Sequence, residues 1–295
     1  MSGLSDPRTL ETVELRDGRT LAYALFGVPE GRPVLYFHGY PGSRLEAAVA
    51  HDAATQHGVR LIAIDRPGFG RSTFKPGRRI LDWPDDVSEL ADRLGLQRFA
   101  AMGVSGGGPY AAACAYRIPE RLTHVAIVCG VGPFGTPGAT DGMMITNRIL
   151  FWISRYSQTA VRLLLLPMLW GLRRNPERAV RTMLRQLPAV DRSVFEDEEV
   201  LAAFATGALE ALRQGTRPSG LEGQLYARPW GFRLEDVARE VHLFQGELDV
   251  NVPAVMGRHQ AEALPRCRAH FYPEEGHISL ALNRVDDVLG VLGAD

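Results

Sequence analysis

Ser105 stands in the sequence GVSGG, residues 103–107, which matches the pattern Gly-x-Ser-x-Gly. An apolar run, residues 98–104, precedes this serine, and a run typical of a helix, residues 106–118, follows it. A serine on a sharp strand-to-helix turn has a strained backbone, and glycines on both sides let the strand and the helix pack closely. The pattern therefore predicts that Ser105 is a nucleophile. A glycine-rich turn with a capping serine is the alternative interpretation.

Two residues that each follow a late predicted strand supply the base and the acid that a serine nucleophile needs. His277 comes just after the run 267–274, and Asp249 comes at the end of the run 241–249. Because the carboxyl ends of parallel strands meet at one edge of a sheet, we expect both side chains to lie near Ser105. The sequence therefore predicts a catalytic triad of these three residues.

Two other carboxylates are alternatives for the acid. Glu247 lies two residues before Asp249, and Asp141 follows the predicted sixth strand. The turn sequence DVNVP, which begins at Asp249, favours the aspartate.

The loop HGYPGS, residues 38–43, follows a predicted strand and precedes a predicted helix. The backbone N–H groups of Tyr40 and Gly106 would together donate hydrogen bonds to the negative charge that develops on a substrate carbonyl. The alternative interpretation is that His38 and Pro41 shape a turn, and both interpretations can hold together. A second loop, DRPGFGRS, begins with Asp65, which we expect to fix the loop by hydrogen bonds to its backbone.

The sequence implies no cofactor and no metal. Residues 130–135 fit the pattern Gly-x-Gly-x-x-Gly of dinucleotide sites, but Pro133 interrupts them and no helix is predicted to begin there. Cys114, Cys129 and Cys267 lie far apart, which argues against a disulfide framework or a zinc site and indicates a reducing compartment.

The charges of the chain are balanced. Its 295 residues include 33 basic and 34 acidic side chains, so no basic field is available to bind nucleic acid. The first 20 residues show no apolar core of a secretory signal, and the most apolar stretch, residues 163–172, is too short to span a bilayer. We therefore expect a cytoplasmic protein without a transmembrane segment, and both a monomer and a homodimer stay open.

Strand and helix patterns alternate along the chain, which predicts an α/β fold with a mostly parallel central sheet flanked by helices. An N-terminal hairpin is predicted from residues 12–15 and 20–27. The later strands are predicted within residues 33–39, 59–65, 98–104, 123–130, 241–249 and 267–274, and the helices within 44–58, 83–96, 106–118, 252–265 and 278–293.

This alternation stops near residue 133, and residues 142–232 show helical patterns with no convincing strand. We therefore predict an α/β core made of residues 1–132 and 233–295. An all-helical cap, residues 133–232, would be inserted after the sixth strand.

We expect the predicted cap to help form an apolar pocket for the substrate. The candidate pocket residues are His38, Trp152, Met168, Trp170, Val250 and Ile278. Alternatively, the apolar residues of the cap form its own small core. A membrane-surface role for the run 162–174 is a further interpretation, against which Pro167 counts because it interrupts the run.

The motifs HGYPGS, DRPGFGRS, GVSGGGPY, GELDVNVP and EGH occur in the order typical of the α/β-hydrolase fold family, which this chain resembles over nearly its whole length. The resemblance implies Ser105 as nucleophile, Asp249 as acid, His277 as base, and Tyr40 and Gly106 as the oxyanion hole. Epoxide hydrolases and haloalkane dehalogenases of this shape use an aspartate nucleophile, where this chain has a serine. Proline iminopeptidases have the loop HGGPG, where this chain has HGYPG.

These features predict a serine hydrolase that cleaves carboxylic esters or related acyl bonds of an apolar small molecule through an acyl-enzyme, as in enzyme class 3.1.1. The alternatives are a C–C bond hydrolase, a lactonase, or a lyase or cyclase of small-molecule metabolism that uses the same triad. A non-catalytic ligand receptor that kept the fold is the remaining alternative.

Overall fold

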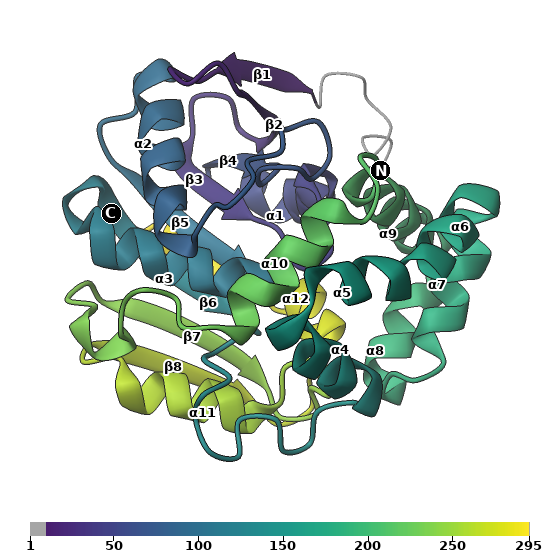
Figure 1. The fold of residues 1–295 in the computed structure, drawn as a ribbon. Coiled ribbons are helices and arrows are strands. Elements are labelled where there is room, and N and C mark those ends of the chain that lie inside the picture. Colours follow the sequence, from purple (N-terminus) through teal and green to yellow (C-terminus); the bar gives the residue numbers. More distant parts are fainter. Residues whose placement is uncertain (1–9, 295) are drawn as a thin grey trace.

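A single eight-stranded sheet runs through the molecule (Figure 1). The computed structural model describes residues 10–294. The strand order is β1-β2-β4-β3-β5-β6-β7-β8. β2 is antiparallel to both of its neighbours, and each of the other neighbouring pairs is parallel. The strands are β1 (Glu11–Glu14), β2 (Thr20–Gly27), β3 (Arg32–Phe37), β4 (Val59–Ile64), β5 (Phe99–Val104), β6 (Leu122–Val128), β7 (Val241–Gly246) and β8 (Cys267–Tyr272).

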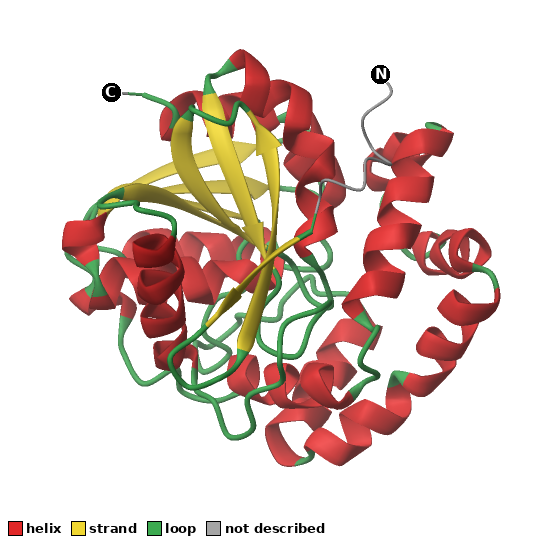
Figure 2. Ribbon diagram, turned by 90° about the horizontal axis from the view of Figure 1, so that it is seen from above, coloured by secondary structure: helices red, strands yellow, loops and turns green. Residues whose placement is uncertain are grey.

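Helices cover both faces of this sheet, which confirms the predicted fold class (Figure 2). Neighbouring residues of β3 alternate between two cores: Leu35 and Phe37 belong to one, and Val34 and Tyr36 to the other. Strands that are buried on both faces appear in the sequence as continuous apolar runs, so these strands could be predicted from the sequence. The first core is covered by α2 (Trp83–Arg93), α3 (Gly108–Arg117) and α11 (Ala254–Ala263), and the second by α1 (His51–Gln56), α12 (Ile278–Asn283) and α13 (Val285–Leu292).

Between β6 and β7 the chain forms a series of helices that lie to one side of the sheet (Figure 1). We call residues 133–232 the cap segment. Its apolar side chains form a third core around Leu172, Val180 and Leu201. The helices are α4 (Ile145–Tyr156), α5 (Gln158–Leu164), α6 (Leu166–Arg174), α7 (Pro176–Leu184), α8 (Ala189–Ser193), α9 (Glu198–Ala211) and α10 (Arg217–Ala227).

Two predicted helices are divided in the structure. A 3-10 helix, Arg44–Ala50, precedes α1. We attribute its tighter winding to two side chains of its first turn that are fixed in the core, because Arg44 donates to Asp65 and Glu46 accepts from the Tyr36 hydroxyl. The last predicted helix is interrupted at Arg284, whose φ of −112° and ψ of 15° are not helical.

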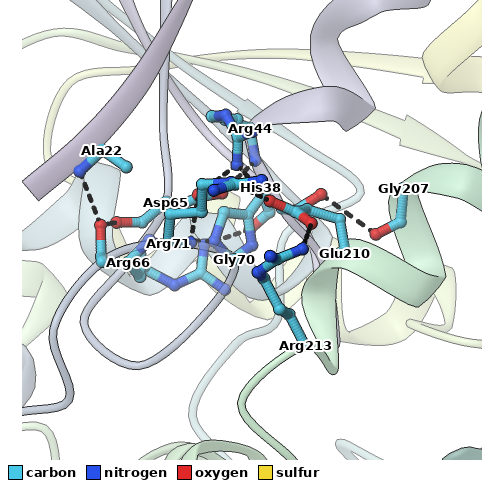
Figure 3. Close-up of polar contacts among 12 residues, drawn as sticks. Ala22, His38, Arg44, Asp65, Arg66, Gly70, Arg71, Gly207, Glu210 and Arg213 are labelled. Atoms are coloured by element: carbon cyan, nitrogen blue, oxygen red, sulfur yellow. Dashed lines mark hydrogen bonds and ion pairs between the residues drawn. The ribbon is translucent and has the colours of Figure 1, made fainter. Parts of the chain in front are cut away.

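A cluster of charged side chains joins the loops that follow β3 and β4 to the cap segment (Figure 3). Arg44 Nη1 lies 2.6 Å from Asp65 Oδ2 and 2.8 Å from Glu210 Oε1 on α9. Arg71 and Arg213 also reach the Glu210 carboxylate. Asp65 accepts the backbone N–H groups of Arg44 and Arg71, so it fixes its loop as the sequence predicted.

No helix within residues 10–294 is both long enough and apolar enough to cross a membrane. Residues 1–9, on which the expected lack of a secretory signal partly rests, lie outside the described residues.

Candidate active site

Ser105 occupies the turn between β5 and α3, and its backbone is in the left-handed region with a φ of 53°. Glycine is required at positions 103 and 107 because backbone carbonyl oxygens lie too close to leave room for a Cβ atom. A Cβ on Gly103 would lie 2.4 Å from the Gly107 carbonyl oxygen, and a Cβ on Gly107 would lie 2.0 Å from the Phe37 carbonyl oxygen. A strained residue of this kind persists only where its surroundings impose the conformation. The turn therefore holds the serine side chain at the carboxyl edge of the sheet.

Ser105, His277 and Asp249 form a continuous chain of hydrogen bonds. His277 Nε2 lies 2.9 Å from Ser105 Oγ, and His277 Nδ1 lies 2.6 Å from Asp249 Oδ2. Asp249 is fixed in turn, since its Oδ1 accepts the backbone N–H groups of Asn251 and Val252 at 2.8 Å each. A neutral His277 in this position can accept the serine proton, and Asp249 selects the tautomer that does so.

The structure separates the alternative acids from the histidine. Glu247 forms an ion pair with Arg258 at 2.5 Å. Asp141 lies beside Gly138 in the loop before α4. Of the three candidates, Asp249 is the carboxylate that contacts His277.

Tyr40 and Gly106, the two expected oxyanion residues, lie close together. A Cβ on Gly106 would lie 2.7 Å from Tyr40 Cβ, so the two residues lie next to each other. The loop before Tyr40 is fixed by charges: both Glu46 carboxylate oxygens accept the Gly39 N–H at 3.0 Å, and the Arg66 guanidinium donates to the Gly39 carbonyl at 2.8 Å. The N–H of Gly106 belongs to the first turn of a helix, where no intrahelical acceptor is available.

A model of the α/β hydrolase fold family matches residues 32–283. The chain belongs to the α/β-hydrolase fold family. Among curated proteins, a non-heme chloroperoxidase of Streptomyces lividans is 34% identical over 124 residues, which are 41% of this chain and 45% of that protein. A bifunctional esterase/perhydrolase of Acinetobacter calcoaceticus is 32% identical over 123 residues, which are 41% of this chain and 44% of that protein. The alignments thus span less than half the length of these relatives.

Solved structures resemble this α/β-hydrolase over nearly its whole length. A hydrolase from Pseudomonas aeruginosa PA01 has a TM-score of 0.69 at 20% identity and covers 98% of this chain and 100% of its own. A thermophilic esterase from Thermogutta terrifontis has a TM-score of 0.67 at 22% identity and covers 96% of each chain. At these identities the likeness shows the fold alone.

The charges around His277 determine the pH range in which its imidazole is neutral in this α/β-hydrolase. Burial lowers the pKa of His277, but the Asp249 carboxylate, its hydrogen bond and the charge of Asp191 outweigh burial and raise the pKa above the ordinary value of 6.5. The neutral form that accepts a proton therefore predominates only above this raised pKa.

We expect the acid limb of the kcat/KM profile to have its midpoint above pH 6.5, because protonated His277 cannot accept the serine proton. The measurement is kcat/KM for a p-nitrophenyl ester across the pH range in which the fold is intact. A midpoint below pH 6.5 would contradict the assignment of His277 as the base.

Asp191, which no sequence motif marks, reaches from α8 of the cap segment to the histidine. Its carboxylate is fully buried and accepts the backbone N–H groups of His277, Ile278 and Ser279 at 3.1, 2.9 and 2.9 Å. It thus caps the helix that begins after His277, and it places a negative charge near the imidazole. The cap segment therefore helps to position His277.

Asp191→Ala should lower the free energy of unfolding by about 2–3 kcal/mol, because three backbone N–H groups lose a charged acceptor. It should also move the acid limb of kcat/KM to lower pH, since the Asp191 charge raises the pKa of His277. Asp197→Ala is the matched control, because Asp197 caps α9 at an exposed position. An unchanged acid limb in Asp191→Ala would show that Asp191 has only a structural role.

α10 of the cap segment contacts both residues of the expected oxyanion hole. The Tyr40 hydroxyl donates to the Ser219 carbonyl at 2.8 Å, and the Tyr226 hydroxyl lies 2.8 Å from the Gly106 carbonyl. These contacts give the cap segment a direct role in the geometry of the turn and the loop that flank the nucleophile.

Glu222 of α10 holds together a buried charge network under the same loop. Glu222 Oε1 lies 2.7 Å from Arg66 and 2.6 Å from the Tyr226 hydroxyl, and Oε2 accepts from Arg78. Burial raises the pKa of Glu222, but the charges of Arg66 and Arg78 outweigh burial and hold its pKa at about 2. The carboxylate therefore stays ionised between two guanidinium groups.

We expect Glu222→Gln to lower the free energy of unfolding by about 3–5 kcal/mol, because it leaves two buried guanidinium groups without a counter-charge. Since the folded-state pKa of about 2 lies below the ordinary 4.5, this stabilisation is present above pH 4.5 and is lost as the pH falls toward 2. Denaturant unfolding at neutral and acidic pH measures both effects. Glu198→Gln, which breaks an exposed ion pair with Arg181, should cost at most about 1 kcal/mol. Equal losses in the two variants would contradict this account.

The six expected pocket residues lie in different places. Met168, Val250 and Ile278 pack against the core of the cap segment, and Val250 and Ile278 directly follow Asp249 and His277 in the chain. His38 is fully buried: its Nδ1 contacts the Gly39 carbonyl and its Nε2 accepts the Arg66 N–H. It therefore links the loop before Tyr40 to Arg66, which corrects the expectation that it lines a pocket.

The positions of Trp152 and Trp170 also contradict the expectation that they line a pocket. Their side chains are 66% and 64% exposed on the outer side of α4 and α6. The sequence showed that these helices are rich in apolar residues, but it did not show which side of each helix faces inward, because both helices are apolar on more than one side.

Proposed function

We propose that this chain hydrolyses carboxylic esters of apolar small molecules through an acyl-enzyme on Ser105. The observation that carries the proposal is the hydrogen-bonded chain from Ser105 through His277 to Asp249, with the serine on a strained turn beside the predicted oxyanion donors. This arrangement supplies a nucleophile, a base and an acid that orients the base.

In the proposed reaction, Ser105 Oγ attacks the ester carbonyl while His277 Nε2 accepts its proton. The Tyr40 and Gly106 N–H groups stabilise the oxyanion, and His277 then returns the proton to the leaving alcohol. Water attacks the resulting acyl-enzyme, with His277 again as the base, and releases the acid. No step requires a metal or an organic cofactor.

An apolar substrate is supported by the apolar residues that directly follow Asp249 and His277 in the chain. Val250 and Ile278 are these residues, and they are partly buried against the apolar core of the cap segment, as is Met168. The esterase named in the Acinetobacter relative is consistent with this reaction class. We place the activity in the cytoplasm, which agrees with the free thiols of the three cysteines.

The experiment is turnover of p-nitrophenyl esters of rising acyl chain length, followed by analysis of the products in water enriched in heavy oxygen. We expect a burst of p-nitrophenol, an optimum beyond acetate, and one solvent oxygen in the acid product. Products without solvent oxygen would favour a lyase or cyclase, and tight binding without turnover would favour a receptor. Either result would overturn the proposal.

A further inference from the structure

The outer side of the cap segment exposes an unusual concentration of apolar side chains. Eight of the thirteen exposed large apolar residues within residues 10–294 lie between residues 145 and 174. Scattered single apolar residues are normal on a protein surface, whereas a concentration of this kind marks an interaction site. We use the name apolar cap face for Ile145, Ile149, Trp152, Tyr156, Leu163 and Trp170.

The residues of the apolar cap face lie on three consecutive helices. Ile145, Ile149, Trp152 and Tyr156 follow each other at helical spacings of three and four residues, so they share one side of α4, and the last two rings lie 5.4 Å apart. α4 and α5 contact each other, and both contact α10. α6 begins directly after α5 and contacts it, so α4, α5 and α6 follow one another along the cap segment (Figure 1).

The same stretch carries only positive charge. Residues 145–174 contain five arginines and no aspartate or glutamate, although the whole chain has a net charge of −1. All five arginines are exposed, and within residues 10–294 none of them is ion-paired with a carboxylate. Arg174 lies over the Trp170 ring at 5.2 Å, which joins a charge to the apolar cap face. The arginines are Arg148, Arg155, Arg162, Arg173 and Arg174.

We propose that the apolar cap face docks onto a lipid surface that carries anionic headgroups. Helices that lie in a membrane interface combine tryptophan and leucine on one side with arginine or lysine around them, and attraction to anionic lipid adds to the buried apolar area. The indole rings of Trp152 and Trp170 enter the headgroup boundary, and the arginines contact phosphates. This explains why both tryptophans face outward rather than into a pocket.

The test uses the wild-type chain and vesicles of phosphatidylcholine, alone or with about 30 mol% phosphatidylglycerol. Trp83 and Trp230 are buried, so a change in tryptophan fluorescence on binding reports on Trp152 and Trp170. We expect co-sedimentation at least about tenfold stronger with the anionic vesicles, weakened by salt, together with a blue shift of the emission. The absence of binding to anionic vesicles would overturn the proposal.

Matched variants locate the surface. Trp152→Ala with Trp170→Ala should reduce vesicle binding about tenfold, whereas Tyr116→Ala with Phe204→Ala, which removes exposed aromatic rings elsewhere, should not. Equal losses in the two pairs would overturn the proposal.

A second pair tests the charges. Arg148→Gln with Arg173→Gln should weaken binding and reduce its salt dependence, and Arg79→Gln with Arg233→Gln should leave both unchanged. An equal effect of the two arginine pairs would overturn the assignment to this face.

Two further measurements are needed. The first distinguishes lipid docking from docking of a second copy of the chain, and the second distinguishes lipid docking from the proposed function. A dimer in light scattering that Trp152→Ala with Trp170→Ala dissociates, without vesicle binding by the wild type, would assign the face to a second copy of the chain and overturn lipid docking. Ser105→Ala should bind vesicles like the wild type. Loss of turnover with intact binding therefore bears on the proposed function alone.

Discussion

Ser105→Ala is expected to lower kcat for ester hydrolysis by about a million-fold, because no other group in the triad can form the acyl-enzyme. His277 Nε2 keeps its place but loses the hydroxyl that lies 2.9 Å from it. The measurement is the steady-state rate with a p-nitrophenyl ester, with unfolding curves to show that the fold is retained.

Ser193→Ala is the control for this variant, since Ser193 is exposed on the cap segment and bonds only to the Val190 carbonyl in the described structure. It should keep wild-type activity. Activity of Ser105→Ala above about one per cent of the wild type would contradict the role of Ser105 as nucleophile.

Asp249→Asn is expected to lower kcat by about 10⁴-fold with little change in the fold. An amide in place of the carboxylate can donate to His277 Nδ1, which favours the tautomer whose Nε2 carries a proton and cannot act as a base. The loss of the charge also lowers the pKa of His277, because Asp249 is the partner that raises it most.

The matched control is Glu247→Gln, which changes the alternative acid two residues earlier in the chain. Glu247 pairs with Arg258 and makes no contact with His277, so this variant should keep kcat within about twofold of the wild type. A large loss in Glu247→Gln and a small one in Asp249→Asn would reverse the assignment of the acid.

The positions of the triad residues could be predicted because each follows a strand that the sequence marks clearly. β5 and β7 appear in the sequence as mostly apolar runs, β8 as the mixed run CRAHFY, and Ser105, Asp249 and His277 come after these strands. A parallel sheet brings such positions to one edge, so local patterns were sufficient to bring together three side chains from distant parts of the chain. Their catalytic roles stay predictions.

The contacts of the cap segment could not be predicted in this way. Asp191 meets His277 86 residues later, and Glu222 meets Arg66 156 residues earlier. Neither carboxylate stands in a motif, because its partners are determined by how the helices pack on the core. For the same reason the apolar pattern of α4–α6 did not show that Trp152 and Trp170 face outward.

The most direct test of the central claim, that Ser105 is an activated nucleophile, is labelling with a fluorophosphonate probe and location of the adduct by peptide mass spectrometry. The account predicts a single adduct on Ser105 in the wild type and no adduct in Ser105→Ala. A well-folded wild type that stays unlabelled, or an adduct that persists on another residue in Ser105→Ala, would contradict it.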